Sequence, residues 1–296
     1  MTDSPTTERP RDTGHLDTGH LDAGHPADDH GPRLRVLVAE DNLVNCRVAQ
    51  LLLQRLGHSV DTAGDGMQAV EAALRGRYDV VLMDVQMPFL DGLLATRQIR
   101  ARLPTAVQPR VIALTASVLP SDRAACLDAG MDDCLKKPLR TADLQTALAG
   151  IGVTRRGHRR PTGRTDGAAA READILHRLD ELAGPDPAAD DVLLPQLLMS
   201  FTDRATEELD DLLTALGRHD LPAAERVAHS LRGAAANLGA TALAAACEDV
   251  EDRSRLGSAD FGPHLAQRLR DEVELTVEAM RAVRLQLMTG AAGRTG

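Results

Sequence analysis

The chain has 296 residues, of which 43% are hydrophobic but only 1% aromatic, and it carries a formal net charge of -10. The few aromatic rings (Tyr78, Phe89, Phe201 and Phe261) are scattered, so they cannot form the platform on which proteins stack bases or sugars. A net negative chain is also poorly suited to wrapping nucleic acid or lying on an anionic membrane. The composition therefore favours proteins and small ions as partners, and the length suggests two domains.

No apolar stretch approaches the roughly 18 to 20 uncharged residues that a membrane span requires, and the N-terminus lacks an apolar signal region, so we expect a cytoplasmic protein without a membrane span. The cysteines, Cys46, Cys126, Cys134 and Cys247, show no C-x-x-C spacing. We expect them to be small reduced hydrophobic residues rather than a disulfide framework or a zinc site.

Residues 1–32 are polar and contain a short tandem repeat, TGHLD-TGHLD-AGHPA. This composition predicts a disordered N-terminal tail. The repeat spaces His15, His20, His25 and His30 five residues apart, which raises the alternative of a metal site. Because the segment lacks the apolar content that would preorganise these histidines, a low-complexity tail is the favoured interpretation.

Between residues 33 and 150, short β-branched runs alternate with amphipathic stretches. The pattern predicts strands at 34–39, 58–62, 78–84, 111–115 and 133–136, and helices at about 42–56, 66–76, 91–102, 120–129 and 139–149. Strands that alternate with helices form a parallel sheet covered on both faces. We therefore expect an α/β doubly wound five-stranded parallel sheet, in which ligands bind beyond the carboxyl ends of the strands.

Residues 151–170 are rich in arginine, proline and glycine, which predicts a linker. Contact with nucleic acid is the alternative for these arginines, but the segment has no aromatic ring and no predicted helix that could recognise bases. From 171 to 290 only helical patterns occur, at about 172–183, 190–217, 221–238, 240–256 and 260–288. Short segments with Gly, Pro and Asp between these helices predict an all-α helical bundle, followed by a tail at 291–296.

Three acidic residues end predicted strands or begin the loops that follow them: Glu40, Asp41 and Asp84. Carboxylates that converge in one crevice repel each other, and a hard divalent cation such as Mg2+ relieves that repulsion. Thr115 ends the fourth predicted strand, and Lys137 follows the fifth. A carboxylate nucleophile, a metal, a hydroxyl and an ammonium are the parts that stabilise a phosphoryl group in transfer to an aspartate.

The segment at about 33–150 resembles the response-regulator receiver domain, particularly the type attached to hybrid histidine kinases. The matching stretches are VAEDNLVN (38–45), GDGMQAVE (64–71), MDVQMPFLDG (83–92), ALTAS (113–117) and AGMDDCLKKPL (129–139). The resemblance implies a flavodoxin-like fold with Asp84 as phosphoacceptor. It also implies a Mg2+ site made by Asp41, the supporting acid Glu40, Asp84 and the backbone carbonyl of Gln86. Thr115 would bind a phosphoryl oxygen, and Lys137 would pair with the acyl phosphate.

One position departs from the receiver pattern. The family usually has Tyr or Phe three residues before the lysine of the Lys-Pro pair, whereas this chain has Cys134. A switch that works by rotation of an aromatic ring cannot operate at this position. The departure favours a domain that transfers the phosphoryl group to another protein group over one that signals its phosphorylation through a conformational change.

A single histidine stands out on the predicted helix at 221–238. At about 100° per residue, His229 lies away from the apolar seam, so we expect its ring to face solvent. Glu225, Arg232, Gly233 and Ala236 share its face. Glycine costs roughly 1 kcal/mol in a helix interior, so Gly233 suggests that a partner surface approaches closely here.

The string AHSLRGAAANLGATAL (228–243) resembles the histidine-phosphotransfer (HPt) domain. The resemblance covers about 175–285 of the bundle expected at 171–290, and it implies that His229 is a phosphoacceptor. Arg232 stands where the family usually has lysine, which keeps the charge but replaces a flexible point charge with a planar fork.

Together the two resemblances imply a two-component phosphorelay protein that accepts a phosphoryl group on Asp84 and exchanges it through His229. The expected partners are a sensor histidine kinase and other receiver domains. No Gly-rich nucleotide loop occurs in the sequence, so we expect a carrier without a kinase domain of its own. The route between Asp84 and His229 stays open, within one molecule or between two.

Two other functions fit parts of the pattern. In the first, the bundle is a docking module or a phosphate sink controlled by the receiver. In the second, the sheet belongs to a phosphohydrolase with an aspartyl nucleophile. Such enzymes usually carry a second acid two residues after the nucleophile, where this chain has Gln86.

Overall fold

A computed structural model describes residues 33–116, 119–149, 167–258, 261 and 264–294. The predicted tail at 1–32 and residues 151–166 of the predicted linker at 151–170 lie outside the described residues. Beyond the first 31 residues, the chain forms one compact unit, Pro32–Gly296.

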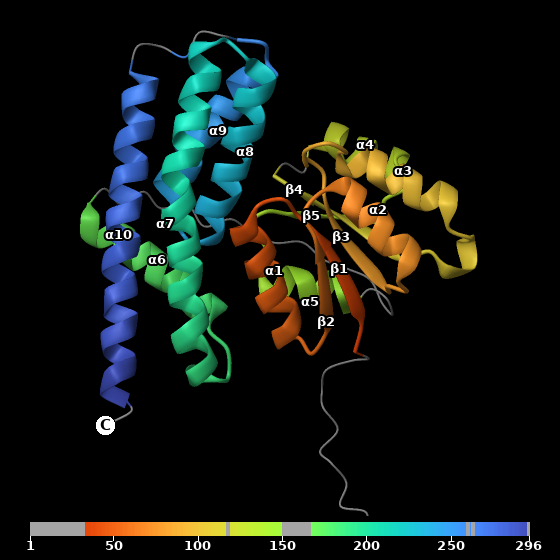
Figure 1. The fold of residues 1–296 in the computed structure, drawn as a ribbon, viewed down its shortest axis with the longest axis horizontal. Helices are drawn as coiled ribbons and strands as arrows, with labels where there is room; N and C mark the ends of the chain where they lie inside the picture. The colour runs from red at the N-terminus through yellow and green to blue at the C-terminus, as the bar shows by residue number, and fades with distance from the viewer. Residues whose placement is uncertain (1–32, 117–118, 150–166, 259–260, 262–263, 295–296) are drawn as a thin grey trace, which may run out of the picture. The chain divides into compact units, whose positions relative to one another are not determined.

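The first half of this unit contains a parallel sheet with the strand order β2-β1-β3-β4-β5 (Figure 1). Its strands are β1 (Arg35–Ala39), β2 (Ser59–Ala63), β3 (Val80–Asp84), β4 (Arg110–Thr115) and β5 (Asp133–Lys136). Every pair of neighbours is parallel. This order is the flavodoxin-like one, so the predicted α/β class is confirmed.

Helices cover both faces of the sheet because the strands alternate their buried side chains between two clusters. In β1, for example, Val36 and Val38 belong to one cluster, and Leu37 and Ala39 belong to the other. Helices α1 (Leu43–Arg55) and α5 (Thr141–Ala149) contribute to the first cluster, which continues into the second half of the unit. Helices α2 (Gly66–Arg75), α3 (Gly92–Arg102) and α4 (Pro120–Asp128) contribute to the second cluster. A short 3-10 helix at Thr105–Val107 is the one element here that the periodicity does not predict.

The second half of the unit is helical, as predicted. Its helices are α6 (Ala168–Leu182), α7 (Pro187–Gly217), α8 (Leu221–Asn237), α9 (Thr241–Arg255) and α10 (Leu265–Arg294). Helices α8 and α9 pack together, and α10 packs against α6, α7 and α9. The apolar seam of α8 is buried at Ala224, Ala228, Leu231 and Ala235. In the described part of the chain, no helix is long and apolar enough to cross a membrane.

Candidate functional site

The predicted acidic cluster forms at the carboxyl ends of β1 and β3. These strands are parallel neighbours with Ala39 opposite Met83, so the residues that follow Ala39 lie beside Asp84. Oxygen atoms of Glu40, Asp41 and Asp84 all lie within 4.8 Å of one another. The side chains of Glu40 and Asp84 are buried.

Glycine is required where the loop after β3 returns to the sheet. A Cβ atom at Gly92 would lie 2.0 Å from the backbone oxygen of Asp84. The start of α3 can therefore pass directly beside the end of β3 only because residue 92 has no side chain. This close approach fixes the loop that carries Gln86.

Lys137 closes the acidic cluster from the end of β5. Its Nζ atom lies 2.6 Å from Oδ2 of Asp84 and 2.7 Å from Oε2 of Glu40, and its side chain is buried. The backbone N–H of Gln86 donates to the other oxygen of Asp84 at 3.2 Å. Each oxygen of Asp84 thus has a defined partner.

The pKa shifts describe a crowded acidic pocket. Burial and the nearby Glu40 carboxylate raise the pKa of Asp41 to about 6. The same two causes raise the pKa of Asp84 well above its ordinary value, although Lys137 opposes the shift. Burial alone would lower the pKa of Lys137, but Asp84 and Glu40 outweigh it and raise the pKa.

This donor set fits a hard divalent cation. Carboxylate oxygens are the ligands that Mg2+ prefers, and a cation relieves the repulsion that raises the two aspartate pKa values. Lys137 already offers one positive charge to Glu40 and Asp84, with which it forms ion pairs. A divalent cation would add the charge that a cluster of three acids still lacks.

Thr115 ends β4 at the same edge of the sheet, as predicted. It lines a cavity of about 160 Å³ together with Gln86, His229, Glu251 and other residues. The side-chain amide of Gln86 donates to Glu225 on α8 at 3.5 Å. The structure therefore brings predicted residues from both resemblances to one cavity.

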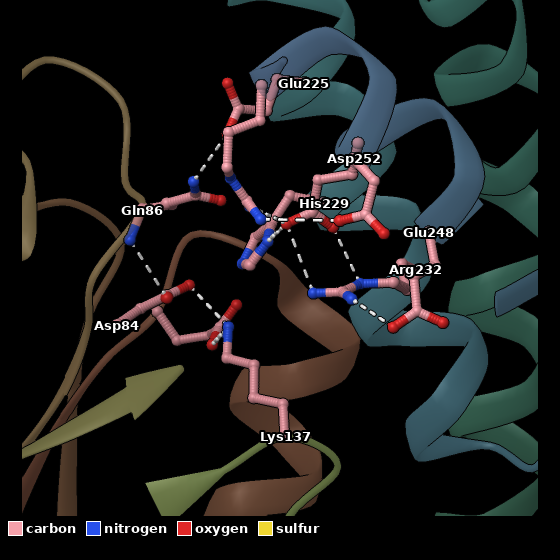
Figure 2. A network of polar contacts seen from close by, with 11 residues as sticks. Asp84, Gln86, Lys137, Glu225, His229, Arg232, Glu248 and Asp252 are labelled. Carbon is pink, nitrogen blue, oxygen red and sulfur yellow. Dashed lines mark hydrogen bonds and ion pairs between the residues drawn. The ribbon is translucent and has the colours of Figure 1, made fainter. Parts of the chain in front are cut away.

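His229 corrects the expectation of a solvent-facing ring, because its exposed fraction is only 7%. The Nδ1 atom lies 3.1 Å from Oε1 of Glu251 on α9, while Nε2 is buried without a hydrogen-bond partner among the described residues. Figure 2 shows the ring of His229 between the carboxylates of the bundle and the pocket that holds Asp84 and Lys137. The prediction was wrong because helical periodicity identifies only the seam within the bundle, whereas other segments also cover α8.

The environment of His229 favours a neutral ring. Burial lowers its pKa, and the hydrogen bond to Glu251 opposes this shift without reversing it. A neutral imidazole that donates from Nδ1 to a carboxylate carries its lone pair on Nε2. The nitrogen without a hydrogen-bond partner among the described residues, Nε2, is thus the nucleophilic one.

Arg232 lies one turn beyond His229, but its guanidinium is occupied by acidic residues. Its Nε atom lies 2.9 Å from Oε2 of Glu251, and its Nη1 donates to Glu248 at 3.3 Å (Figure 2). A second arginine, Arg255, lies 2.8 Å from Oε1 of Glu251. These arginines and the ring of His229 outweigh burial and lower the pKa of Glu251.

Glu251 is the site residue that the sequence interpretation missed. The spacing around the turn between α8 and α9 could have identified it, because His229 lies 10 residues before Gly239 and Glu251 lies 12 residues after it. Because antiparallel helices joined by a tight turn place such positions at similar heights, an acid near position 250 can reach the histidine.

Comparisons with known proteins identify the families of two regions of the chain. Residues 36–149 match the family described as "Response regulator receiver domain", and residues 196–282 match the "Hpt domain". One similar solved structure is the receiver domain of the sensor histidine kinase PA1611 from Pseudomonas aeruginosa PAO1, which holds a magnesium ion in its active-site cleft. The two sequences are 47% identical, and the match covers 40% of this chain and 97% of that structure, with a TM-score of 0.37.

Longer relatives contain both regions. The aerobic respiration control sensor protein ArcB of Escherichia coli (strain K12) is 31% identical over 255 residues, which is 85% of this chain and 32% of that protein. The sensor histidine kinase AruS of Pseudomonas aeruginosa is 35% identical over 231 residues, 78% of this chain and 22% of that protein. The chain thus spans about a third or less of the length of these relatives. The chain contains a member of the response regulator receiver domain family, followed by a member of the Hpt domain family.

Proposed function

We propose that this chain is a phosphorelay carrier in which Asp84 accepts a phosphoryl group and His229 exchanges it. The observation that carries the proposal is the state of His229. Glu251 holds Nδ1, Nε2 has no hydrogen-bond partner among the described residues, and the residue lines a cavity that Thr115 and Gln86 also line. The proposed receiver spans 33–150 and the proposed phosphotransfer bundle spans 171–290.

Asp84 is the proposed nucleophile of the receiver. One of its oxygens attacks the phosphorus of a donor, and the donor's leaving group departs with the electron pair of the broken bond. Lys137 and the hydroxyl of Thr115 would bind the phosphoryl oxygens. A Mg2+ ion held by Glu40, Asp41, Asp84 and the backbone carbonyl of Gln86 would neutralise negative charge on the transferring group.

His229 is the proposed second carrier. Its Nε2 attacks the phosphorus of the acyl phosphate, and the Asp84 carboxylate leaves with the electrons of the broken P–O bond. The proton stays on Nδ1, so the ring becomes positively charged as the N–P bond forms. The Glu251 carboxylate at 3.1 Å stabilises that charge, and no proton transfer is needed in either direction.

The proposed partners are a sensor histidine kinase, which supplies the phosphoryl group, and other receiver domains that exchange it with His229. The match of the bundle to the Hpt family favours this carrier over a docking module or a phosphate sink. The amide of Gln86, where a phosphohydrolase would have an acid, leaves the hydrolase alternative without support.

Labelling with radioactive acetyl phosphate and Mg2+ tests the proposal. Wild type is expected to carry label on both Asp84 and His229. His229→Gln should retain only hydroxylamine-sensitive label on Asp84, and Asp84→Asn should carry none on either residue. Label that survives in Asp84→Asn would contradict the assignment of Asp84.

A further inference from the structure

The receiver and the bundle share one buried surface around α1. A single apolar cluster includes Leu51 and Leu52 of α1 together with Ile175 of α6, Leu194 of α7 and Ala228 of α8. Helix α1 makes contacts with α6, α7 and α8. The apolar face of α1 that the sheet leaves uncovered is thus covered by the chain's own bundle.

Polar contacts fix the register of this surface at both ends of α1. At its start, Nδ2 of Asn42 donates to Oγ of Ser230 at 2.9 Å. At its end, the guanidinium of Arg55 forms an ion pair with Asp190 on α7, and both side chains are mostly buried. The backbone N–H of Gly184 donates to the second oxygen of Asp190 at 2.6 Å.

Between these ends, a buried hydrogen-bond chain connects the bundle to the acidic pocket. Nδ2 of Asn237 donates to Oδ1 of Asn45 at 2.8 Å, and Nδ2 of Asn45 donates to Oε1 of Glu40 at 2.9 Å. The exposed fractions of these three side chains are 1%, 3% and 3%. Buried amides keep such positions only when each partner is present, so the bundle helps to hold Glu40 in place.

The close approach of the receiver to α8 accounts for the glycine at position 233, despite the free-energy cost of glycine in a helix interior. A Cβ atom there would lie 2.9 Å from Nδ2 of Asn45, which Glu40 and Asn237 hold in position. The sequence suggests that Gly233 makes room for a partner, and in the structure that partner is the chain's own receiver.

We infer that Asp84 and His229 exchange the phosphoryl group within one molecule, and that the docked receiver closes His229 to other receivers until the α1 surface separates from the bundle. This inference rests on the proposed function and names the partner of His229 as the receiver of the same chain. The step is the one written above: the Nε2–P bond forms as the Asp84 P–O bond breaks, and Nδ1 keeps its proton.

A mixing experiment separates the two routes. Asp84→Asn supplies an intact His229, and His229→Gln supplies an intact Asp84. With acetyl phosphate and Mg2+, wild type should form phosphohistidine at a rate that does not change on dilution. The mixture of the two variants, at the same total concentration, should form it at least about tenfold more slowly, because each His229 is covered by its own receiver.

Reversing the charge at position 55 should separate the receiver from the bundle of the same chain and make His229 accessible to another receiver. When Arg55→Asp is added to the Asp84→Asn chain, the new aspartate is repelled by Asp190 of the same chain. Asp190 is then free to pair with Arg55 of the His229→Gln chain. Phosphohistidine in the mixture should then rise by about tenfold. Arg75→Asp, a substitution of the same kind on α2 whose side chain is 78% exposed, is the matched control and should change nothing.

Within one chain, Arg55→Asp alone should slow phosphohistidine formation, and Arg55→Asp combined with Asp190→Arg should restore it, which distinguishes lost docking from a failure to fold. Phosphohistidine in the unaltered mixture at the wild-type rate, or a wild-type rate proportional to concentration, would overturn the inference. Absence of phosphohistidine from wild type itself, with Asp84 labelled, would instead overturn the proposed function.

Discussion

The carboxylate of Glu251 accepts a hydrogen bond from Nδ1 of His229 at 3.1 Å, although the two residues are 22 positions apart. The same carboxylate pairs with Arg232 and Arg255. A buried acid held by two cations stays ionised, which fixes the tautomer of the ring and leaves Nε2 as the reactive atom. The orientation of His229 is therefore set by an acid outside the motif that identifies it.

Replacing Glu251 with glutamine should slow phosphohistidine formation by about 10- to 100-fold, the usual cost of removing a carboxylate that orients a histidine. The amide has no negative charge to stabilise the phosphorylated ring, and its NH2 group can donate to Nδ1 and favour the wrong tautomer. Rapid-quench labelling gives the rate, and ¹⁵N NMR of the ring gives the tautomer.

Glu248→Gln is the matched control for this variant, because Glu248 is 55% exposed and contacts Arg232 but not His229. Its rate should stay within about twofold of wild type, as for most exposed substitutions. Equal rates for Glu251→Gln and wild type would remove Glu251 from the mechanism.

The pH dependence of His229 follows from its lowered pKa. Because burial lowers the folded-state pKa below the ordinary 6.5, protonation favours the unfolded chain. The contribution of His229 to stability is therefore present above the unfolded pKa and is lost as pH falls through the folded one. NMR titration of the ring should show a midpoint below 6.5, and a midpoint above it would contradict the neutral buried ring.

Magnesium affinity should depend on the acids of the cluster and on no other carboxylate of the sheet. Isothermal titration calorimetry should detect one Mg2+ site in wild type, weakened about tenfold or more by Asp41→Asn, because each lost carboxylate removes a ligand and a charge. Asp61→Asn, on β2 and outside the cluster, is the control. Equal affinities in all three proteins would place the metal elsewhere.

Asp84→Asn should make the metal-free protein more stable at neutral pH. Burial and Glu40 raise the folded pKa of Asp84 above its unfolded value, so its ionised form costs stability once the pH exceeds the unfolded pKa. Lys137 keeps Glu40 as a partner in the variant. Urea denaturation measures the change, and a clear loss of stability would show that the pair with Lys137 dominates.

The fold and the acidic pocket could be predicted because local rules determine them. Alternating strands and helices specify a parallel sheet, and Glu40, Asp41 and Asp84 then meet at one edge of it. The burial of His229 could not be predicted in the same way. It depends on contacts such as that between Asn45 and Asn237, which are 192 positions apart. Helical periodicity indicates only which face of a helix packs into its own bundle. A polar face that the receiver covers, such as that of α8, therefore has the same pattern as a face exposed to solvent.

The most direct test of the account is ³¹P NMR of the wild-type chain and of Asp84→Asn after incubation with acetyl phosphate and Mg2+. We predict a phosphohistidine resonance with phosphorus on Nε2 of His229 in wild type and none in Asp84→Asn, because the group reaches the ring only through the aspartate. A phosphohistidine resonance of equal intensity in Asp84→Asn, or none in wild type whose Asp84 is phosphorylated, would contradict a relay between these two residues.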